Sequence, residues 1–528
     1  MKSVKEKSKK IFWFKIGMLF ITAIYFLTHI IALTELPVFA DEAIYIRWAQ
    51  LIIDDWKQYL FFSMNDGKTP LFIWLITSAL NLWKDPLHAG RMISVIVGIF
   101  QIGIAIKTVE KLKGGLVAQM LAAFSVMFLP FWYFHHRMAL MDALLTLFLS
   151  CSFLFLIKAQ LEKKETKKHT IISGVFLGLA LFTKIPAILF FPALVLLSFI
   201  PKKNSSFANR LTKSAKVVLI GMFIFALLKL TPTFGQLFNR GGDFLYPLSE
   251  LTEKGIFTIL WSNIKLIFQS LFRYLSWPIM ILPLFGLFQE KFRKTHGILI
   301  LSFLGFVGPI LLLGKTIYPR YIMPSIFPIT ISAALSFEYL IKKAQENLKK
   351  PLSFFSQTAF ILFALTTIAQ TAIMFVLISW QKPFYLPLVP IDRIQYLTEW
   401  SAGDGIKEST DLMLQETKHN SLAVATEGYF GTLPDGVLMY LHKQDVTGLM
   451  VEGIGQPVRE IPEEFTNKAR LYESTWLLVN SHREKMDLQK NSPELLIQEF
   501  CRGEGAPCLQ LWDISTVIDA PQDKILDN

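Results

Sequence analysis

Two adjacent carboxylates, Asp41 and Glu42, follow the first long apolar run of the chain, in the segment LPVFADEAIYIRWAQLIIDDW at residues 36–56. A carboxylate that is partly desolvated at a membrane surface can accept a proton from a substrate hydroxyl or amine. The same residues also suit a structural role, because Asp41 can cap a helix and Glu42 can interact favourably with its dipole. From the residues alone, both interpretations stay open.

Single basic residues lie at other points where an apolar run begins or ends. They are Lys68 in DGKTP, Lys184 in LFTKIP, and Lys315 and Arg320 in GKTIYPRY, where Tyr321 follows directly. A lone lysine in such a place often only extends its amine to water. Lysine and arginine also bind phosphate groups, and a tyrosine hydroxyl adds a hydrogen bond. An anionic headgroup in the outer leaflet would therefore explain all of these residues at once.

Asp142 begins another apolar run, in the segment HHRMALMD at residues 135–142. An ionised residue in such a run is costly, so Asp142 is a candidate functional residue. His135 and His136 are adjacent and therefore point in different directions on a helix, which argues against a metal ion shared between them. We expect no metal site here.

The composition indicates a membrane protein. The 528 residues are 52% hydrophobic and only 18% charged, whereas an ordinary soluble domain carries roughly a quarter charged residues. Residues 1–381 hold 40 Lys and Arg against 18 Asp and Glu, and residues 382–528 hold 13 against 23. The positive charge lies in short clusters between apolar runs, which is typical of cytoplasmic loops and argues against a nucleic-acid-binding surface.

Apolar runs of about twenty residues predict about eleven membrane spans. The expected spans are about 11–33, 89–110, 116–134, 139–157, two within 171–200, and then 217–232, 271–288, 297–313, 322–341 and 354–380. The basic N-terminus and basic loops are expected in the cytoplasm, which places the tail outside it. The outer segment 34–88 should begin with an amphipathic helix in the membrane interface.

The chain therefore divides into a helical transmembrane domain, residues 1–381, and a soluble extracytoplasmic α/β domain, residues 382–528. In the tail, SLAVAT, TWLLVN and CLQLWDI resemble strands, and stretches such as DGVLMYLHK and SPELLIQEF resemble helices or turns. Cys501 and Cys508 close a short loop. A disulfide between them is consistent with an extracytoplasmic tail, and their spacing is not that of a metal site.

These motifs, taken in order, resemble those of the GT-C membrane glycosyltransferases. The shared features are ADEAIYIRWAQ, then KTPLFIWL with GRMISVIVG, then RMALMD, GLALFTK and finally YPRYIMP. Within that group, residues 10–345 are most similar to the dolichyl-phosphate-mannose protein mannosyltransferases and the lipid A aminoarabinose transferases. The tail lies outside the shared pattern.

The resemblance implies an inverting enzyme that moves a sugar from a polyprenyl-phosphate carrier to an acceptor at the outer face of the cytoplasmic membrane. Asp41 would be the catalytic base, and Glu42 and Tyr45 would shape the site. Asp142 would orient the acceptor or a basic neighbour. The residues implied in binding the carrier phosphate are Lys68, Lys184, Arg320 and Tyr321. No metal or other cofactor is expected besides the lipid-linked donor.

Several points stay open. The related aminoarabinose enzymes carry an acidic residue where this chain has Gly67, and K-x-P replaces their K-P pair, so the sugar is undetermined. The acceptor is a protein, a lipid or a glycan. Two other functions are possible: a flippase for lipid-linked sugars without covalent chemistry, and a metal-dependent enzyme similar to the oligosaccharyltransferases. A flippase should carry ionisable residues near the middle of the membrane, whereas here they lie at span ends.

Overall fold

The structure is a computed structural model that describes residues 2–162, 167–200, 205–349, 351–444 and 446–519. The chain divides into two compact units. The first comprises Met1–Leu33, Leu60–Leu75 and Arg91–Val389, and the second comprises Thr34–Tyr59, Ile76–Gly90 and Pro390–Asn528. The predicted domain boundary at 381 lies close to the change of unit after Val389. The second unit differs from the prediction because it also contains much of the first outer segment.

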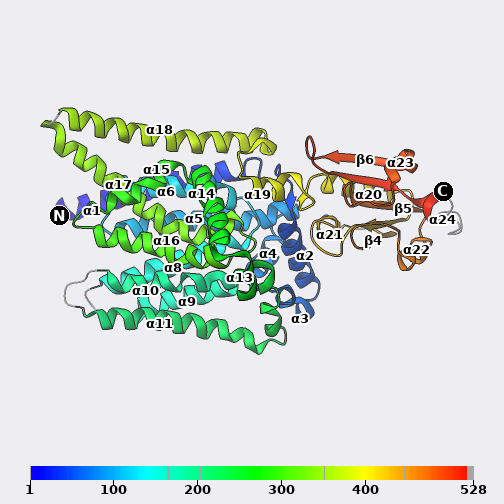
Figure 1. The fold of residues 1–528 in the computed structure, drawn as a ribbon, viewed down its shortest axis with the longest axis horizontal. Helices are drawn as coiled ribbons and strands as arrows, with labels where there is room; N and C mark the ends of the chain where they lie inside the picture. Colours follow the sequence, from blue (N-terminus) through cyan, green and yellow to red (C-terminus); the bar gives the residue numbers. More distant parts are fainter. Residues whose placement is uncertain (1, 163–166, 201–204, 350, 445, 520–528) are drawn as a thin grey trace. The chain divides into compact units, whose positions relative to one another are not determined.

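The first unit is helical, and Figure 1 shows its long helices running side by side. Every predicted span contains at least part of one of them. The α-helices of this unit, long and short, are α1 (Lys2–Ile30), α5 (Pro86–Lys111), α6 (Leu116–Phe128), α7 (Pro130–His135), α8 (Met141–Leu161), α9 (Lys167–Thr183), α10 (Phe191–Leu196), α11 (Phe207–Ala226), α12 (Gly241–Phe244), α13 (Leu248–Lys254), α14 (Ile256–Leu275), α15 (Trp277–Gly286), α16 (Arg293–Leu313), α17 (Met323–Glu346) and α18 (Pro351–Gln381).

Among the described residues, six helical stretches are long and apolar enough to cross a membrane. They are Pro86–Lys111, Met141–Leu161, Phe207–Leu230, Arg293–Leu313, Pro319–Glu346 and Ser353–Gln381. Other predicted spans correspond to shorter apolar helices, such as Ile16–Ile30 and Leu116–Phe128. The predicted span at 271–288 is not continuous, because α14 ends before Ser276 and α15 begins after it with Pro278 in its first turn. The number of membrane crossings stays a prediction.

The second unit contains a sheet and short helices. Its helices are α2 (Ala40–Asp54), α3 (Trp56–Tyr59), α19 (Pro390–Arg393), α20 (Ile406–Glu416), α21 (Asp435–Leu441), α22 (Glu463–Ala469), α23 (Leu488–Asn491) and α24 (Ser515–Asp519). Helices α4 (Leu71–Ala79) and α5 have residues in both units. Its strands are β1 (Val38–Phe39), β2 (Ala402–Gly403), β3 (Leu422–Thr426), β4 (Leu449–Gly453), β5 (Ser474–Asn480), β6 (Leu496–Cys501) and β7 (Cys508–Asp513).

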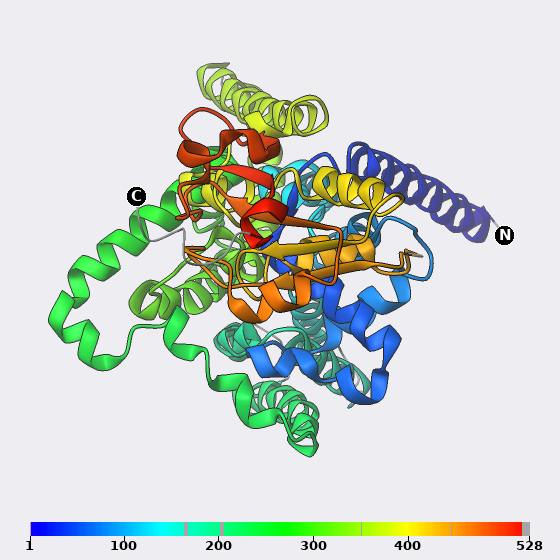
Figure 2. The ribbon, with the colours of Figure 1, turned by 90° about the vertical axis from the view of Figure 1, so that its right-hand side faces the viewer.

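The main sheet has five strands in the order β4-β3-β5-β7-β6, and Figure 2 shows them in orange to red. β3 pairs in parallel with β4 and β5, and Leu422 lies opposite both Leu449 and Ser474. β7 runs antiparallel to β5 and β6. All five residues of β3 are buried, as expected for a central strand covered on both faces. One face packs on α22 and α24 through a core that includes Phe465, Leu477 and Ile518.

The predicted α/β character of the tail is confirmed. The strands expected at SLAVAT, TWLLVN and CLQLWDI are β3, β5 and β7, and the helix expected in DGVLMYLHK is α21. The prediction for SPELLIQEF is confirmed only for Pro493–Leu495, a short 3-10 helix, and is wrong for the rest, because Leu496–Cys501 forms the edge strand β6. Five of the six residues of β6 lie opposite residues of β7 in an antiparallel pair, and such pairing between strands decides the structure of a short segment more than its local preference does.

The helix expected in the membrane interface is α2, and most of its apolar side chains are buried. Ile44, Trp48 and Ile52 are each at most 9% exposed. The amide of Gln50 donates a hydrogen bond of 2.8 Å to the backbone carbonyl of Met439 in α21. The apolar face of α2 therefore belongs to the core of this unit.

Candidate functional site

Asp142 is the centre of an ionic group in the first unit. It lies in the first turn of α8 and is 3% exposed. Lys184, which follows α9, donates a hydrogen bond of 2.8 Å from Nζ to Oδ1 of Asp142. Arg320, in the short helix Pro319–Ile322, places Nε 4.0 Å from Oδ2. Three segments far apart in the sequence therefore meet at one buried carboxylate.

Tyrosine rings complete this group. Nζ of Lys184 lies 4.7 Å from the centre of the Tyr321 ring. The Arg320 guanidinium lies 4.8 Å from the ring centre of Tyr318 and 5.4 Å from that of Tyr321. Rings at these distances stabilise the cations and restrict where they point. The group thus holds two cations and one carboxylate close together, and fixed cations of this kind can bind an anionic ligand.

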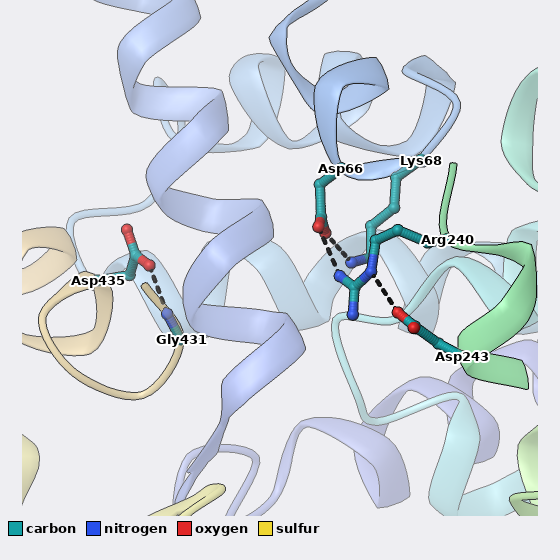
Figure 3. Close-up of polar contacts among 6 residues, drawn as sticks. All are labelled: Asp66, Lys68, Arg240, Asp243, Gly431 and Asp435. Atoms are coloured by element: carbon teal, nitrogen blue, oxygen red, sulfur yellow. Dashed lines mark hydrogen bonds and ion pairs between the residues drawn. The ribbon is translucent and has the colours of Figure 1, made fainter. Parts of the chain in front are cut away.

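Lys68 belongs to a second ionic group in the first unit, shown in Figure 3. Asp66 accepts hydrogen bonds from both Lys68 and Arg240. Nε of Arg240 also donates to Oδ2 of Asp243 at 2.8 Å. The sequence analysis did not identify Asp66, Arg240 or Asp243. Arg240 carries the same signal as the cations that it did identify, a single basic residue in a turn outside the spans.

Gly67 explains how this second group forms. Its φ of +72° is a left-handed conformation that favours glycine, and a Cβ there would lie 3.3 Å from the carbonyl oxygen of Leu237. The chain turns at Gly67, and Lys68 donates its backbone N–H to the carbonyl of Ser63. The turn brings the side chains of Asp66 and Lys68 together.

The two groups are connected through the segment 240–246. Lys315 donates its backbone N–H to the carbonyl of Phe244 at 2.8 Å. The ring centres of Phe244 and Tyr321 lie 6.1 Å apart. The stretch that carries Arg240 and Asp243 therefore lies beside the turn that carries Arg320, and the two groups belong to one region of the first unit. Lys315 itself lies 3.6 Å from the carboxylate of Glu250.

The adjacent histidines have different environments. His135 is buried, its Nδ1 lies 2.7 Å from the carbonyl of Phe131, and it interacts electrostatically with Asp142. His136 is also buried and lies near Tyr25 and Trp132, with ring centres 6.2 Å and 5.7 Å away. Only His135 therefore adjoins the group around Asp142.

The predicted catalytic base Asp41 and the predicted site-shaping residues Glu42 and Tyr45 lie in the second unit, on α2. The helix begins at Ala40 with Phe39 as its N-cap, so the interpretation of Asp41 as the cap is wrong. Glu42 is fully buried and accepts a hydrogen bond of 3.0 Å from the backbone N–H of Phe39. Glu42 therefore closes the start of the helix. Asp41 is half-buried in the first turn, and Tyr45 is buried beside Trp48.

Asp435, in α21, is a titratable residue beside α2 that the sequence analysis missed. Its Oδ2 accepts a hydrogen bond of 2.7 Å from the backbone N–H of Gly431 (Figure 3). Burial raises the pKa of Asp435 to about 6, although the Gly431 N–H and the Arg47 charge act in the opposite direction. The folded unit therefore binds this proton more tightly than the unfolded chain does.

We expect Asp435→Asn to stabilise the second unit at pH 8 and to have little effect at pH 4. Because the folded pKa of about 6 exceeds the ordinary value of 3.8, the wild-type contribution to stability falls as pH rises between these values. The gain at pH 8 should be at most about 3 kcal/mol, since an asparagine oxygen can still accept from Gly431. Hydrogen exchange of the β3 amides at both pH values measures it. Exposed Asp411 in α20 provides the control, Asp411→Asn, and an equal gain at both pH values would contradict the expectation.

Part of the sequence matches a known protein family, and the fold is similar to those of solved structures. Residues 67–228 match the family model for dolichyl-phosphate-mannose-protein mannosyltransferases. No curated protein sequence matches the chain. Among solved structures, ArnT from Cupriavidus metallidurans in the apo state has a TM-score of 0.56 at 13% identity, with 96% of this chain and 99% of that chain covered.

Other solved structures have a similar fold. ArnT from Cupriavidus metallidurans bound to undecaprenyl phosphate has a TM-score of 0.54 at 13% identity, covering 96% of this chain and 99% of that one. The oligosaccharyltransferase AglB from Archaeoglobus fulgidus, in complex with an inhibitory peptide and a dolichol-phosphate, has a TM-score of 0.51 at 13% identity, covering 89% and 70%. Residues 67–228 therefore match the family model of the dolichyl-phosphate-mannose-protein mannosyltransferases, in a chain whose fold is similar to those of ArnT and AglB.

Proposed function

We propose that this protein is an inverting glycosyltransferase, an integral protein of the cytoplasmic membrane that takes a sugar from a polyprenyl-phosphate carrier. The sugar passes to an acceptor at the outer face, and Asp41 is the general base. The observation that carries the proposal is the group around Asp142, in which Lys184 and Arg320 meet at one buried carboxylate and lie beside the Tyr321 ring. Such a group suits a phosphate, which needs several cations held in fixed positions.

In this proposal the cations act on the leaving group. When the bond between the sugar and the carrier phosphate breaks, negative charge grows on the phosphate, and fixed positive charges lower the energy of that state. Lys184 and Arg320 supply this charge from one group, and Lys68 and Arg240 supply it from the other. Asp142 orients its basic neighbours rather than the acceptor, because its carboxylate lies 2.8 Å from Nζ of Lys184.

Asp41 removes the proton of the acceptor in this proposal. A carboxylate that accepts a proton while the acceptor attacks the anomeric carbon raises the rate by about 10²- to 10⁴-fold in enzymes of this kind. Glu42 is less suited to this step, since it is fully buried and holds the start of α2. Tyr45 lies one turn along the same face and shapes the site.

The nature of the donor is supported by the fold. The ArnT structure is bound to undecaprenyl phosphate, and the AglB structure contains a dolichol-phosphate. Both are polyprenyl phosphates, which consist of a long lipid tail and an anionic head. The carrier proposed here belongs to that chemical class, while the sugar and the acceptor stay undetermined.

A transfer assay with purified protein in lipid nanodiscs tests the proposal. Polyprenyl-phosphate carriers loaded with a radiolabelled hexose, pentose or amino sugar are mixed with envelope extract as the source of acceptor. We expect release of the label from one carrier only when acceptor is present, and unchanged release in EDTA, because the proposal uses the chain's own cations instead of a metal.

Two outcomes would contradict the proposed metal-independent sugar transfer. Loss of transfer in EDTA and its return on adding Mn²⁺ would favour a metal-dependent enzyme similar to the oligosaccharyltransferases. In proteoliposomes, movement of intact carrier between leaflets without any cleavage would favour a flippase. Heat-inactivated protein is the control for cleavage that does not depend on the enzyme.

A further inference from the structure

The second unit has its own candidate site, at the carboxyl ends of β3 and β5. The chain leaves β3 for β4 on one side and then returns past β3 to β5 on the other, because the strand order is β4-β3-β5. Both pairs are parallel. In open α/β sheets of this kind, ligands bind outside the carboxyl ends of the two strands between which the connections diverge. Here those strands are β3 and β5.

A polar network occupies this edge. Glu427 directly follows β3 and is 2% exposed. Its carboxylate accepts hydrogen bonds from the backbone N–H of Asn480 at 2.9 Å, from the Asn480 amide at 2.6 Å, and from Arg483 at 3.1 Å. The ends of both strands are thus joined through planar polar groups. A guanidinium has five N–H donors, and the bond to Glu427 leaves Arg483 with donors for a ligand.

The loop closed by the disulfide Cys501–Cys508 delivers a further cation to this network. Arg502 is 2% exposed and donates hydrogen bonds to Oδ1 of Asn480 and to the carbonyl of Pro507. Its buried Nε has no hydrogen-bond partner among the described residues. A buried N–H group normally has a hydrogen-bond partner, so a further polar group at Nε of Arg502 would gain a hydrogen bond.

Exposed aromatic rings surround the network. Tyr429 and Phe430, in the loop after Glu427, are 74% and 60% exposed, and Trp400 is 37% exposed. The Arg483 guanidinium lies 4.4 Å from the centre of the Trp400 ring. The hydroxyl of Thr432 donates to the carbonyl of Trp400 at 2.9 Å, which ties the loop to that residue. Large apolar rings next to charged groups, open to solvent, are characteristic of binding surfaces.

We propose that this edge of the sheet binds a carbohydrate chain. The apolar face of a sugar ring packs on an aromatic ring, and its hydroxyls form hydrogen bonds with planar carboxylate, amide and guanidinium groups. The aromatic rings here are those of Tyr429, Phe430 and Trp400. The planar polar groups are those of Glu427, Asn480 and Arg483. A nucleic acid is disfavoured by the acidic tail, with 13 Lys and Arg against 23 Asp and Glu in residues 382–528. A lipid surface would use the aromatic rings but has no use for the network.

This inference deepens the proposed function, because a site for a carbohydrate in a protein that transfers sugars indicates that the acceptor is a glycan. The role as acceptor site rests on the proposed function, whereas the binding itself does not. A binding measurement without donor therefore tests the inference separately from transfer.

The test uses full-length protein in nanodiscs on an array of oligosaccharides built from hexoses, pentoses and amino sugars, with short peptides printed beside them. We expect the wild type to bind at least one class of oligosaccharide. Tyr429→Ala together with Phe430→Ala should weaken that binding roughly tenfold. Leu471, 83% exposed on the same unit, provides the matched control, and Leu471→Ala should bind like the wild type.

Three results would overturn the inference: no oligosaccharide bound by the wild type, binding of peptides alone, or equal binding by the aromatic variant. Contact with lipid is tested with Phe430→Cys carrying a fluorophore, which labels selectively because Cys151 is buried and Cys501 is bonded to Cys508. Quenching of that fluorophore by spin-labelled lipid would assign the aromatic residues to the membrane and overturn the carbohydrate site. If binding holds but the protein transfers no sugar, the site stands and the proposed function fails.

Discussion

Replacing Asp41 with asparagine is expected to lower the turnover of sugar transfer by about 10²- to 10⁴-fold, the usual contribution of a positioned general base. The amide has nearly the same shape as the carboxylate but cannot take up the acceptor's proton. Affinity for the carrier should stay the same, because the proposed phosphate ligands are other residues. Initial rates with saturating carrier and acceptor measure the turnover, and direct binding of labelled carrier measures the affinity.

Controls come from the same helix. Asp54, at the end of α2, pairs with His442 at 2.9 Å, and Asp54→Asn should leave turnover nearly unchanged. Glu42→Gln separates the two adjacent carboxylates, since the glutamine oxygen can still accept the hydrogen bond from Phe39. We expect Glu42→Gln to retain most of the turnover. Wild-type turnover in Asp41→Asn would mean that Asp41 is not the base, and loss of turnover in Glu42→Gln beside it would assign that role to Glu42.

Apolar periodicity was enough to predict most of the long apolar helices of the first unit, though not most of α14, and three strands of the second unit. Helix α8 (Met141–Leu161) and strand β3 (Leu422–Thr426) form because of the hydrophobicity and shape of their own side chains, which the sequence displays directly. Where structure depends on distant partners, the sequence analysis failed. The residues of β6 form a strand because β7 lies beside them, and α2 is buried because α21 packs on it.

In the candidate site, too, some residues could be predicted from the sequence, whereas their contacts could not. The cations Lys184 and Arg320 could be identified because single basic residues at span ends are unusual. Their convergence on Asp142 could not be derived, since it depends on how helices α8, α9 and α17 pack. Asp66 was missed because its role depends on the turn at Gly67, and Arg240 was missed although its signal was present. A systematic search for lone basic residues outside the spans would have found Arg240.

Removing the Arg320 guanidinium is expected to weaken carrier binding by about tenfold to a hundredfold. A hydrogen bond to a charged group contributes about 1.5–3 kcal/mol, and Arg320 is buried in its group with little freedom to be replaced by water. Arg320→Gln removes the charge and keeps a side chain of moderate length. Binding of radiolabelled polyprenyl phosphate to protein in nanodiscs measures the effect. Lys342→Gln is the matched control, because Lys342 is a paired cation in α17 that is 62% exposed.

A double variant separates binding from stability and from net charge. Arg320→Gln alone removes one of the two cations around the Asp142 carboxylate, so the thermal midpoint should fall. Asp142→Asn together with Arg320→Gln removes one negative and one positive charge, so the net charge of the group equals that of the wild type. We expect this double variant to regain much of the thermal midpoint but to bind the carrier as weakly as Arg320→Gln. Recovery of carrier affinity in the double variant would mean that the overall charge of the group, and not contact with Arg320, holds the phosphate.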